Sequence, residues 1–243
     1  MNIALYVKWT LAHVREKGFF SAIGRMAEVA WQRIFQGEII IFCFELNHID
    51  FDAVPLPPHI TVERKKRMAD ISPDDMLRLA SVTNERVLSR EMEDHFKRGS
   101  DLWLAKIDGT IATYRWSLRK TPPGHSFFPF SDNDVYMWQL WTYKEYRGRN
   151  IPYHMGHYVL GELKKEGVER AFWTVDRWNK PSLRYTAKMP AYEFGRAKAL
   201  HILGRDIVIW YDMHNRRRVQ RQAKAGHRPR DAADSSVLQR GLQ

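Results

Sequence analysis

The 243-residue sequence has a single cysteine, Cys43. An intrachain disulfide framework and a metal site built from several cysteines are therefore excluded. So little cysteine favours a protein of a reducing compartment. Cys43 lies in an apolar stretch, residues 39–46, and is interpreted as a small buried residue.

Long apolar runs are missing as well. The longest, Ile39–Phe44, is far shorter than the roughly 20 residues that span a bilayer, and no signal-peptide pattern begins the chain. No histidine pair has metal-ligand spacing beside a carboxylate; His154 and His157, three residues apart, are interpreted as solvated or packing residues. We expect a protein without a metal site that is cytoplasmic, either soluble or peripheral to a membrane.

Acidic residues are scarce relative to basic ones. The chain has 39 Lys and Arg against 28 Asp and Glu, a net charge of +11, which favours anionic partners. Residues 213–243 hold eight basic side chains, two carboxylates and hardly any apolar residues, so they are expected to form a disordered basic tail. Such a tail is interpreted as solubilising, with attraction to nucleic acid or a membrane as the alternative.

The first 59 residues predict an extension of the main domain. Residues 3–16 and 19–34 carry apolar stripes at helical spacing and are basic elsewhere. An anionic membrane surface is one partner for such stripes, but packing on the domain or self-association is the commoner outcome. An extra strand over residues 39–46 and a proline-rich linker over 47–58 follow.

From residue 60 the pattern alternates between strands and helices. Ser72 and Pro73 have the chemistry of a helix start. Asp108 and Gly109 form a two-residue hairpin turn between two apolar strands. The predicted order is β-α-α-β-β-β-α-β-α-β, with strands near residues 60–63, 102–107, 110–116, 135–143, 171–175 and 207–211, and helices after 72 and near 85–96, 153–163 and 182–188.

The most informative stretch lies between the strand at 135–143 and the helix that Gly167 ends. A turn that closes a strand and opens a helix directs unpaired amides outward at the positive end of the helix dipole. In this turn Arg147 and Arg149 add positive charge. The turn is therefore predicted to bind phosphate.

The segment Glu145–Ile151 resembles the acyl-CoA pyrophosphate loop of the GNAT superfamily of N-acyltransferases, written Arg/Gln-x-x-Gly-x-Gly/Ala. Arg147 matches its first position, whereas Asn150 and Pro152 stand at the two glycine positions. Asn tolerates a left-handed backbone, but Pro152 has no amide to offer a phosphate. The resemblance implies an acyl-CoA co-substrate bound by Trp141, Thr142, Tyr143, Arg147, Gly148, Arg149, Asn150, Ile151 and Pro152.

A second segment, residues 179–189, resembles the family's Asn-x-x-Ala/Ser-x-x-x-Tyr-x-Lys pattern. Asn179, Ser182 and Lys188 match, and the resemblance implies that Asn179 and Ser182 flank the CoA arm; by itself the pair is equally typical of a helix cap. Thr186 stands where the family has the tyrosine that protonates the leaving thiolate. Tyr185, one residue earlier, is the candidate general acid. We expect the register that brings residue 186 toward the thiol to turn residue 185 about 100° away.

The reaction that the resemblance implies is attack of an amine on an acyl-CoA thioester. The amide of Trp141 or Thr142 is the expected donor to the oxyanion. No general base is identified, because Asp134, Glu145 and His125 are each interpreted as exposed loop residues. The aromatic residues around 136–143 predict either core packing or an aromatic-lined acceptor site; since alternate residues of a strand face opposite sides, only about half are expected to share one face.

These observations predict an α/β protein, an α+β mixed sheet of the GNAT type. Its expected parts are the extension 1–59, the N-acyltransferase domain 60–212 and the tail 213–243. The expected function is CoA-dependent transfer of an acyl group, acetyl in the leading hypothesis, to an amine of an unidentified acceptor, small or macromolecular. The alternatives are a catalytically weak or inactive acyl-CoA-binding protein and a nucleic-acid-binding protein that acts through its basic tail.

Overall fold

The computed structural model describes residues 38–51, 53–81, 85–119, 129–202, 205–212 and 217–221. The two helices expected before residue 35 and the candidate base His125 lie outside these residues, as does the tail after residue 221. Within the described ranges, nine strands form one sheet in the order β2-β3-β4-β5-β6-β1-β7-β8-β9. All neighbouring pairs are antiparallel except β5 with β6.

The first half of the sheet follows the expected order. The strands β2 (Ile60–Lys65), β3 (Asp101–Ile107) and β4 (Thr110–Leu118) form an antiparallel meander. Asp108 and Gly109 join β3 to β4 with positive φ angles of 50° and 77°, the mirror-image turn that matches strand twist. Between β2 and β3 come the helices α3 (Pro73–Ala80) and α4 (Glu85–Lys97), and Ser72 Oγ accepts the amide of Asp75 at 3.1 Å to cap α3.

The second half of the sheet contains the parallel pair. The strand β5 (Asp134–Thr142) leads through a turn into α5 (Ile151–Lys165), and Gly167, at a φ of 84°, ends that helix before β6 (Arg170–Asp176). The helix α6 (Lys180–Thr186) follows, and then the hairpin of β7 (Tyr192–Ile202) and β8 (Arg205–Asp212). The mixed sheet with its helices confirms the expected fold class.

Three parts of the sheet differ from the sequence prediction. The strand β1 (Glu38–Glu45), expected as part of an extension, lies inside the sheet between β6 and β7, so the sheet begins at Glu38 and not at Ile60. The strand β7 was not predicted, because Gly195 and Arg196 interrupt its apolar pattern. Residues 217–221 form the edge strand β9 on β8, which corrects the expectation that the whole of 213–243 is a disordered tail.

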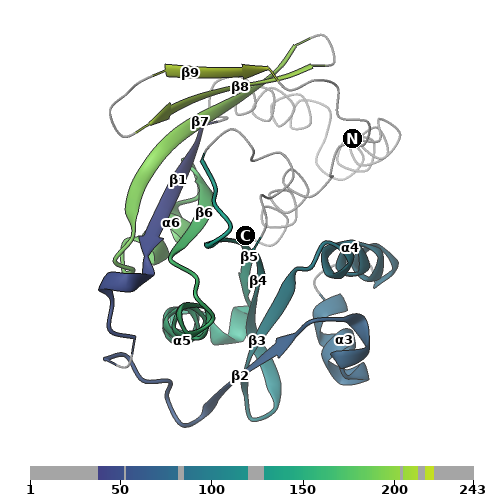
Figure 1. Cartoon of the computed structure of the whole chain (residues 1–243). Helices are drawn as coiled ribbons and strands as arrows, with labels where there is room; N and C mark the ends of the chain where they lie inside the picture. Colours follow the sequence, from purple (N-terminus) through teal and green to yellow (C-terminus); the bar gives the residue numbers. More distant parts are fainter. Residues whose placement is uncertain are drawn as a thin grey trace, which may run out of the picture.

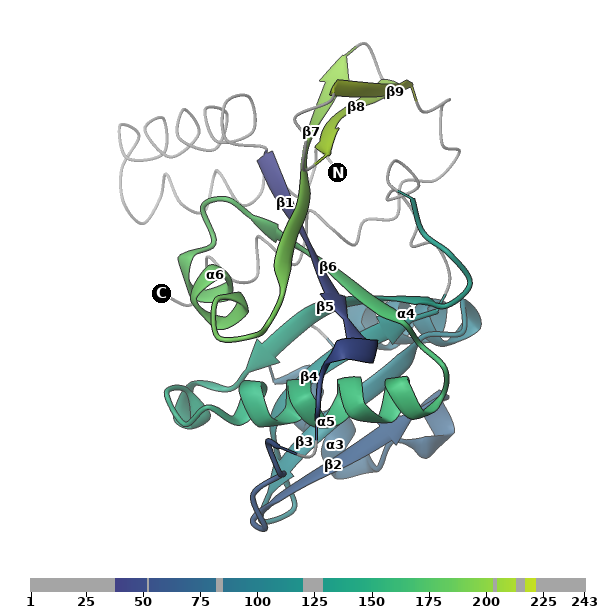
Figure 2. The same ribbon diagram turned by 60° about the vertical axis from the view of Figure 1, so that its left-hand side comes forward.

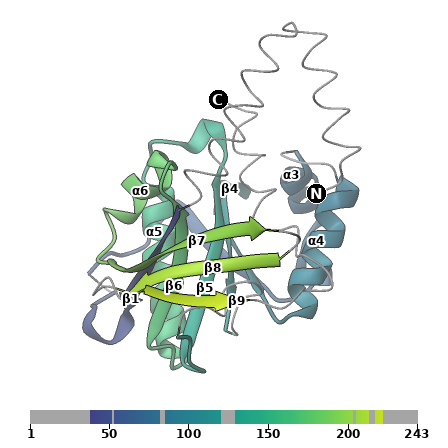
Figure 3. The ribbon, with the colours of Figure 1, turned by 90° about the horizontal axis from the view of Figure 1, so that it is seen from above.

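The helices cover opposite faces of the sheet. Figures 1 and 2 show α5 lying across one face of β3 and β4, with α3 and α4 on the other face. Viewed from above, the strands β7, β8 and β9 run side by side across the end of the molecule (Figure 3). Both faces therefore carry buried apolar side chains.

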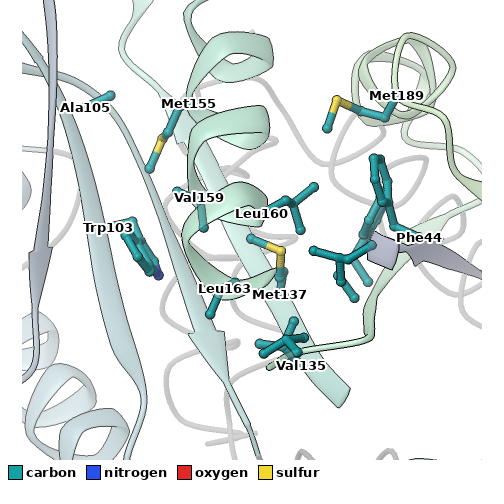
Figure 4. Packing of buried hydrophobic residues seen from close by; sticks show 14 of the residues in the cluster. Phe44, Trp103, Ala105, Val135, Met137, Met155, Val159, Leu160, Leu163 and Met189 are labelled. Atoms are coloured by element: carbon teal, nitrogen blue, oxygen red, sulfur yellow. The ribbon is translucent and has the colours of Figure 1, made fainter. Parts of the chain in front are cut away.

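The larger core lies between α5 and the sheet. Met155, Val159, Leu160 and Leu163 of the helix are at most 1% exposed and pack on Phe44, Trp103, Ala105, Val135 and Met137 (Figure 4). A second cluster packs α3 and α4 on Leu102, Leu104, Ile111, Tyr114 and Trp116. Cys43 is fully buried in a third cluster beside Ile41 and Phe172, as its interpretation as a small buried residue requires.

Candidate active site

The strands β5 and β6 separate soon after they meet. They pair only from Asp134 to Tyr136 and from Arg170 to Phe172, although β5 continues to Thr142 and β6 to Asp176. Because the two strands are parallel, the turn before α5 and the start of α6 both lie at the carboxyl end of these strands. Beyond Tyr136 the edge of β5 that faces β6 is open, and this strand gap is the centre of the candidate site.

A β-bulge marks the place where β5 leaves β6. The register between β4 and β5 shifts between Tyr114 and Trp116, and Gln139 has a φ of 52°. One consequence corrects the expectation that only half of the aromatic residues share a face. Trp138 lies opposite Trp116 and Trp141 lies opposite Tyr114, so both indoles face α3 and α4 although they are three residues apart.

The bulge also fixes which amide faces the strand gap. The amide of Tyr143 donates to the carbonyl of Ala112 at 3.0 Å, so odd-numbered residues at this end of β5 direct their backbone groups toward β4. The amide of Thr142 therefore points to the opposite edge, into the gap. Arg147 Nε donates to the Thr142 carbonyl at 3.2 Å, which fixes the start of the following turn. Of the two amides that the resemblance suggested, those of Trp141 and Thr142, only that of Thr142 points into the strand gap.

The turn between β5 and α5 contains two residues with a left-handed backbone. Gly148 and Asn150 adopt positive φ angles of 80° and 55°, and Asn150 is the N-cap residue of α5. The amides of Gly148, Arg149 and Asn150 make no hydrogen bond to any residue that the structure describes. The exposed guanidinium groups of Arg147 and Arg149 lie 5.7 and 5.6 Å from the ring centroids of Trp141 and Tyr146.

The second matching segment packs beside this turn. Lys188 Nζ donates to Asn150 Oδ1 at 2.8 Å and thereby connects the end of α6 to the start of α5. Asn179 Oδ1 accepts the amide of Ser182 at 3.2 Å, so these two residues form the N-terminal cap of α6. Their expected contact with the CoA arm stays a prediction.

The contacts of Tyr185 and Thr186 differ from the expected orientation. Thr186 is 2% exposed, and its hydroxyl accepts the indole N–H of Trp173 in the core at 3.1 Å. The Tyr185 hydroxyl instead reaches Arg115 on β4, which donates to it at 3.2 Å, and it packs against Gly156 of α5. Arg115 is 3% exposed and stands opposite the bulge. Of the two residues, Tyr185 is therefore the one whose hydroxyl reaches β4, at the place where Arg115 stands opposite the bulge of β5.

The two candidate bases that the structure describes, Asp134 and Glu145, are each paired with an arginine. Asp134, fully buried, accepts two hydrogen bonds from Arg170 and one from the Ser131 amide, so it is not an exposed loop residue. Glu145 is exposed and pairs with Arg78, and this hydrogen bond holds the pKa of Glu145 below its ordinary value. The third candidate, His125, lies outside the described residues. His157, interpreted from the sequence as a solvated or packing residue, is buried against Tyr153 and Phe51, and this burial lowers the pKa of its imidazole.

Sequence reasoning missed a small pocket on the α4 side of the sheet. Glu91 and His95, one helical turn apart on α4, line it together with Tyr114, Trp116 and Gln139. The spacing of four residues between two ionisable side chains was visible in the sequence, but it was read only as part of a helix. Gln139 places this pocket directly at the bulge.

Comparison with known proteins identifies the family. Residues 67–189, about half of the chain, match the model of the Acetyltransferase (GNAT) family. The chain belongs to the GNAT acetyltransferase family. No curated protein matches the sequence of this GNAT chain.

A solved structure of the family shares the fold at low sequence identity. A tandem GNAT protein from the clavulanic acid biosynthesis pathway is 15% identical with a TM-score of 0.51, over 71% of this chain and 56% of that one. An acetyltransferase of the GNAT family from Colwellia psychrerythraea is 8% identical with a TM-score of 0.47, over 64% of this chain and 52% of that one. The GNAT chain thus spans little more than half the length of these proteins, and the likeness extends to the fold alone.

The turn before α5 fits the pyrophosphate of an acyl-CoA. It offers backbone amides that make no hydrogen bond to any described residue, and two exposed guanidinium groups, at the positive end of a 15-residue helix. Pro152 is the one position of the turn that cannot donate. No group of three or more His, Cys, Asp or Glu side chains in the described ranges is arranged to hold a metal ion. In the same part of the chain no helix is long and apolar enough to cross a membrane.

Proposed function

We propose that this GNAT chain transfers an acyl group, acetyl in the first instance, from acyl-CoA to a primary amine by direct attack. The observation that carries the proposal is the junction at the end of β5. There the strand gap, the inward amide of Thr142 and the amide-rich turn before α5 follow one another along nine residues of chain. This junction places a donor for a developing oxyanion next to donors for a pyrophosphate.

Each part of the junction has a role in that reaction. The turn at Arg147 to Asn150 would bind the pyrophosphate through its amides and guanidinium groups. The CoA arm would then pass between α5 and α6 toward the gap, where the Thr142 amide can donate to the thioester oxygen as charge develops on it. When bound, acyl-CoA supplies the activated acyl group; the protein orients it and the amine.

Tyr185 is the candidate donor to the leaving sulfur. Because Arg115 donates to the Tyr185 oxygen, the phenolic hydrogen is left free to point to another acceptor. Arg115 also makes this position rigid, since it is buried on β4. Turnover need not depend on this proton, because a CoA thiol with an ordinary pKa of about 8.5 leaves near neutral pH with little help.

The binding step is tested by calorimetry with acetyl-CoA. Replacing both Arg147 and Arg149 by Ala should weaken binding at least tenfold, because each substitution removes a charge-assisted contact worth about 1.5–3 kcal/mol. The matched control replaces Lys97 and Lys165 by Ala, which removes the same charge from the ends of α4 and α5 far from the turn. Equal binding by the two double variants would refute the assignment of the turn.

The catalytic step is tested by thiol release from acetyl-CoA with a panel of primary amines. Release that requires an amine supports the transferase. Binding without release by any amine would favour the alternative of an acyl-CoA-binding protein without catalysis, which the family membership by itself does not favour. The single cysteine is buried, so a thiol reagent reads the released CoA with little contribution from the protein.

A further inference from the structure

Arg115 is a buried cation without an anionic partner. Within the described ranges, Lys106 and Arg115 are the two buried Lys or Arg residues, 9% and 3% exposed. Lys106 pairs with the carboxylates of Asp75 and Glu63 at 2.8 and 3.0 Å. Arg115 pairs with no carboxylate that the structure describes; it donates from Nη1 to the Tyr185 hydroxyl, and its Nε is buried without a partner. A full charge buried against a neutral phenol costs free energy, so its presence calls for an explanation.

The guanidinium group of Arg115 lies at the strand gap. Arg115 belongs to β4, yet its guanidinium carbon is 6.0 Å from the ring centroid of Trp173 on β6, and Nη1 bonds Tyr185 on α6. In the sheet β5 lies between β4 and β6, so the side chain crosses β5 to make these contacts. Trp173 directly follows Phe172, the last residue of β6 that pairs with β5. The charge is therefore placed where the two strands have separated.

Arg115 approaches the gap from the face of the sheet that α5 covers. Side chains two residues apart on a strand share a face, so Arg115 and Ser117 point the same way. The Ser117 hydroxyl accepts the indole N–H of Trp103 at 2.9 Å, and both Trp103 and Trp173 belong to the core under α5. The CoA arm is proposed to run between α5 and α6, so it would reach the gap along this same face.

The proposed reaction creates a negative charge in this gap. When the thioester C–S bond breaks, its electron pair stays on the sulfur as a thiolate. That sulfur is bonded to the same carbon as the oxygen that the Thr142 amide would hold, so it enters the gap with the oxygen. A positive charge that is already in place and already out of water stabilises such a developing charge without reorganisation.

We propose that Arg115 supplies the positive charge that stabilises the CoA thiolate as it leaves. The inference rests on the proposed transferase function and adds a residue to its site. The amine nitrogen attacks the thioester carbon, a C–N bond forms, and the C–S bond breaks with its electron pair on sulfur. The nitrogen then gives its surplus proton to solvent, so the products are an amide, a proton and a CoA thiolate beside Arg115. Because the charge takes the place of a proton donor, little depends on the Tyr185 hydroxyl.

The first test measures binding and needs no turnover. An opposite charge within about 4–6 Å lowers the pKa of an ionisable group by about 1–3, and the free CoA thiol has a pKa near 8.5. The bound thiol should thus lose its proton at a lower pH than the free thiol, and CoA should bind more tightly as the pH rises. Calorimetry should show a gain of at least roughly eightfold between about pH 6.5 and about pH 9.5. The affinity is expressed relative to that of desulfo-CoA, which has the same phosphates and no thiol.

Three variants separate the charge of Arg115 from a structural role. Arg115→Met should abolish the gain with pH, and Arg115→Lys, which keeps the charge, should retain part of it. The control is Arg119→Met, which removes the same charge just beyond the end of β4, where Arg119 lies 3.7 Å from Glu166, and should retain the whole gain. The melting temperature of Arg115→Met should not fall, because an apolar side chain replaces an unpaired buried charge.

Turnover of acetyl-CoA with a primary amine gives the second test. Arg115→Met should lower kcat by about a hundredfold or more, as loss of a preorganised donor does. KM for acetyl-CoA should change less than about threefold, because the thioester sulfur is neutral until the bond breaks. Arg119→Met should alter neither constant.

Two results would overturn the inference while leaving the transferase intact. One is a wild-type ratio of CoA to desulfo-CoA affinity that does not change with pH, whatever the variants show. The other is an Arg115→Met variant that keeps the whole gain with pH. If neither acetyl-CoA nor desulfo-CoA binds, the proposed function fails and the inference fails with it. If CoA shows the gain but no amine releases a thiol, Arg115 still holds the thiolate and only the proposed transfer is refuted.

Discussion

Replacing Pro152 by Ala should strengthen acyl-CoA binding while it weakens the fold. Pro152 is the second residue of α5, directly after the N-cap Asn150 and Ile151. The next two amides, of Tyr153 and His154, both donate to the Asn150 carbonyl, at 3.0 and 3.2 Å. The second position is therefore the one place where an amide pointing out of the helix end could be added without competing for an existing bond.

The substitution is expected to raise the affinity for acyl-CoA and to lower the stability of the fold. A new amide that reaches the pyrophosphate adds one charge-assisted hydrogen bond, worth about 1.5–3 kcal/mol, or roughly ten- to hundredfold in affinity. Removing the proline ring lowers the free energy of unfolding by about 0.4–1 kcal/mol, because the unfolded chain gains freedom. Calorimetry with acetyl-CoA measures the first effect and urea unfolding without ligand measures the second.

Pro73→Ala is the matched control for this substitution. Pro73 is the first residue of α3, on the other face of the sheet, and is exposed. Its replacement should lower stability by a similar amount and leave affinity for acetyl-CoA unchanged. If Pro152→Ala binds acetyl-CoA no more tightly than the wild-type protein does, the helix end of α5 does not face the pyrophosphate.

Three further outcomes are expected. Gly195→Ala should lower the free energy of unfolding by about 1–3 kcal/mol in urea, because the added Cβ would lie 2.4 Å from the backbone oxygen of Tyr211; an unchanged midpoint would contradict the packing of β7 on β8. Cys43 should resist thiol reagents at pH 8 until the protein is unfolded, because burial raises the pKa of its thiol to about 12; rapid labelling of native protein would contradict this. Tyr185→Phe should lower stability by about 1–3 kcal/mol, since the buried Arg115 loses its hydrogen-bond acceptor, yet should cost less than about threefold in turnover; a hundredfold loss with unchanged binding would make Tyr185 the required acid.

The elements that sequence reasoning found are those set by local chemistry. The Asp108-Gly109 turn, the Ser72 cap and the Gly167 stop each depend on a few adjacent residues, and each appears where it was expected. The turn before α5 belongs to this class. The left-handed conformation of Asn150 follows from its own side chain and from the strand and helix on either side.

The parts that sequence reasoning missed depend on contacts between distant residues. The apolar stretch of β1 predicts a strand, but nothing in it says that the strand pairs with β6 on one side and β7 on the other. Such pairing is decided by residues more than 120 positions away. The edge strand β9 has a polar sequence, Arg217 to Arg221, and takes its conformation from β8.

The β-bulge at Gln139 explains why the site itself was only half predictable. The period-two rule for a strand assigns Trp138 and Trp141 to opposite faces, and no residue in this stretch signals that the rule fails. One additional residue between them reverses the alternation, so the second half of β5 presents its aromatic side chains to α4 while the Thr142 amide faces the strand gap. The same displacement places the Gln139 side chain in the pocket. A regular strand would turn Trp141 toward α5. A single backbone irregularity therefore sets both the face on which Trp141 packs and the direction of the Thr142 amide.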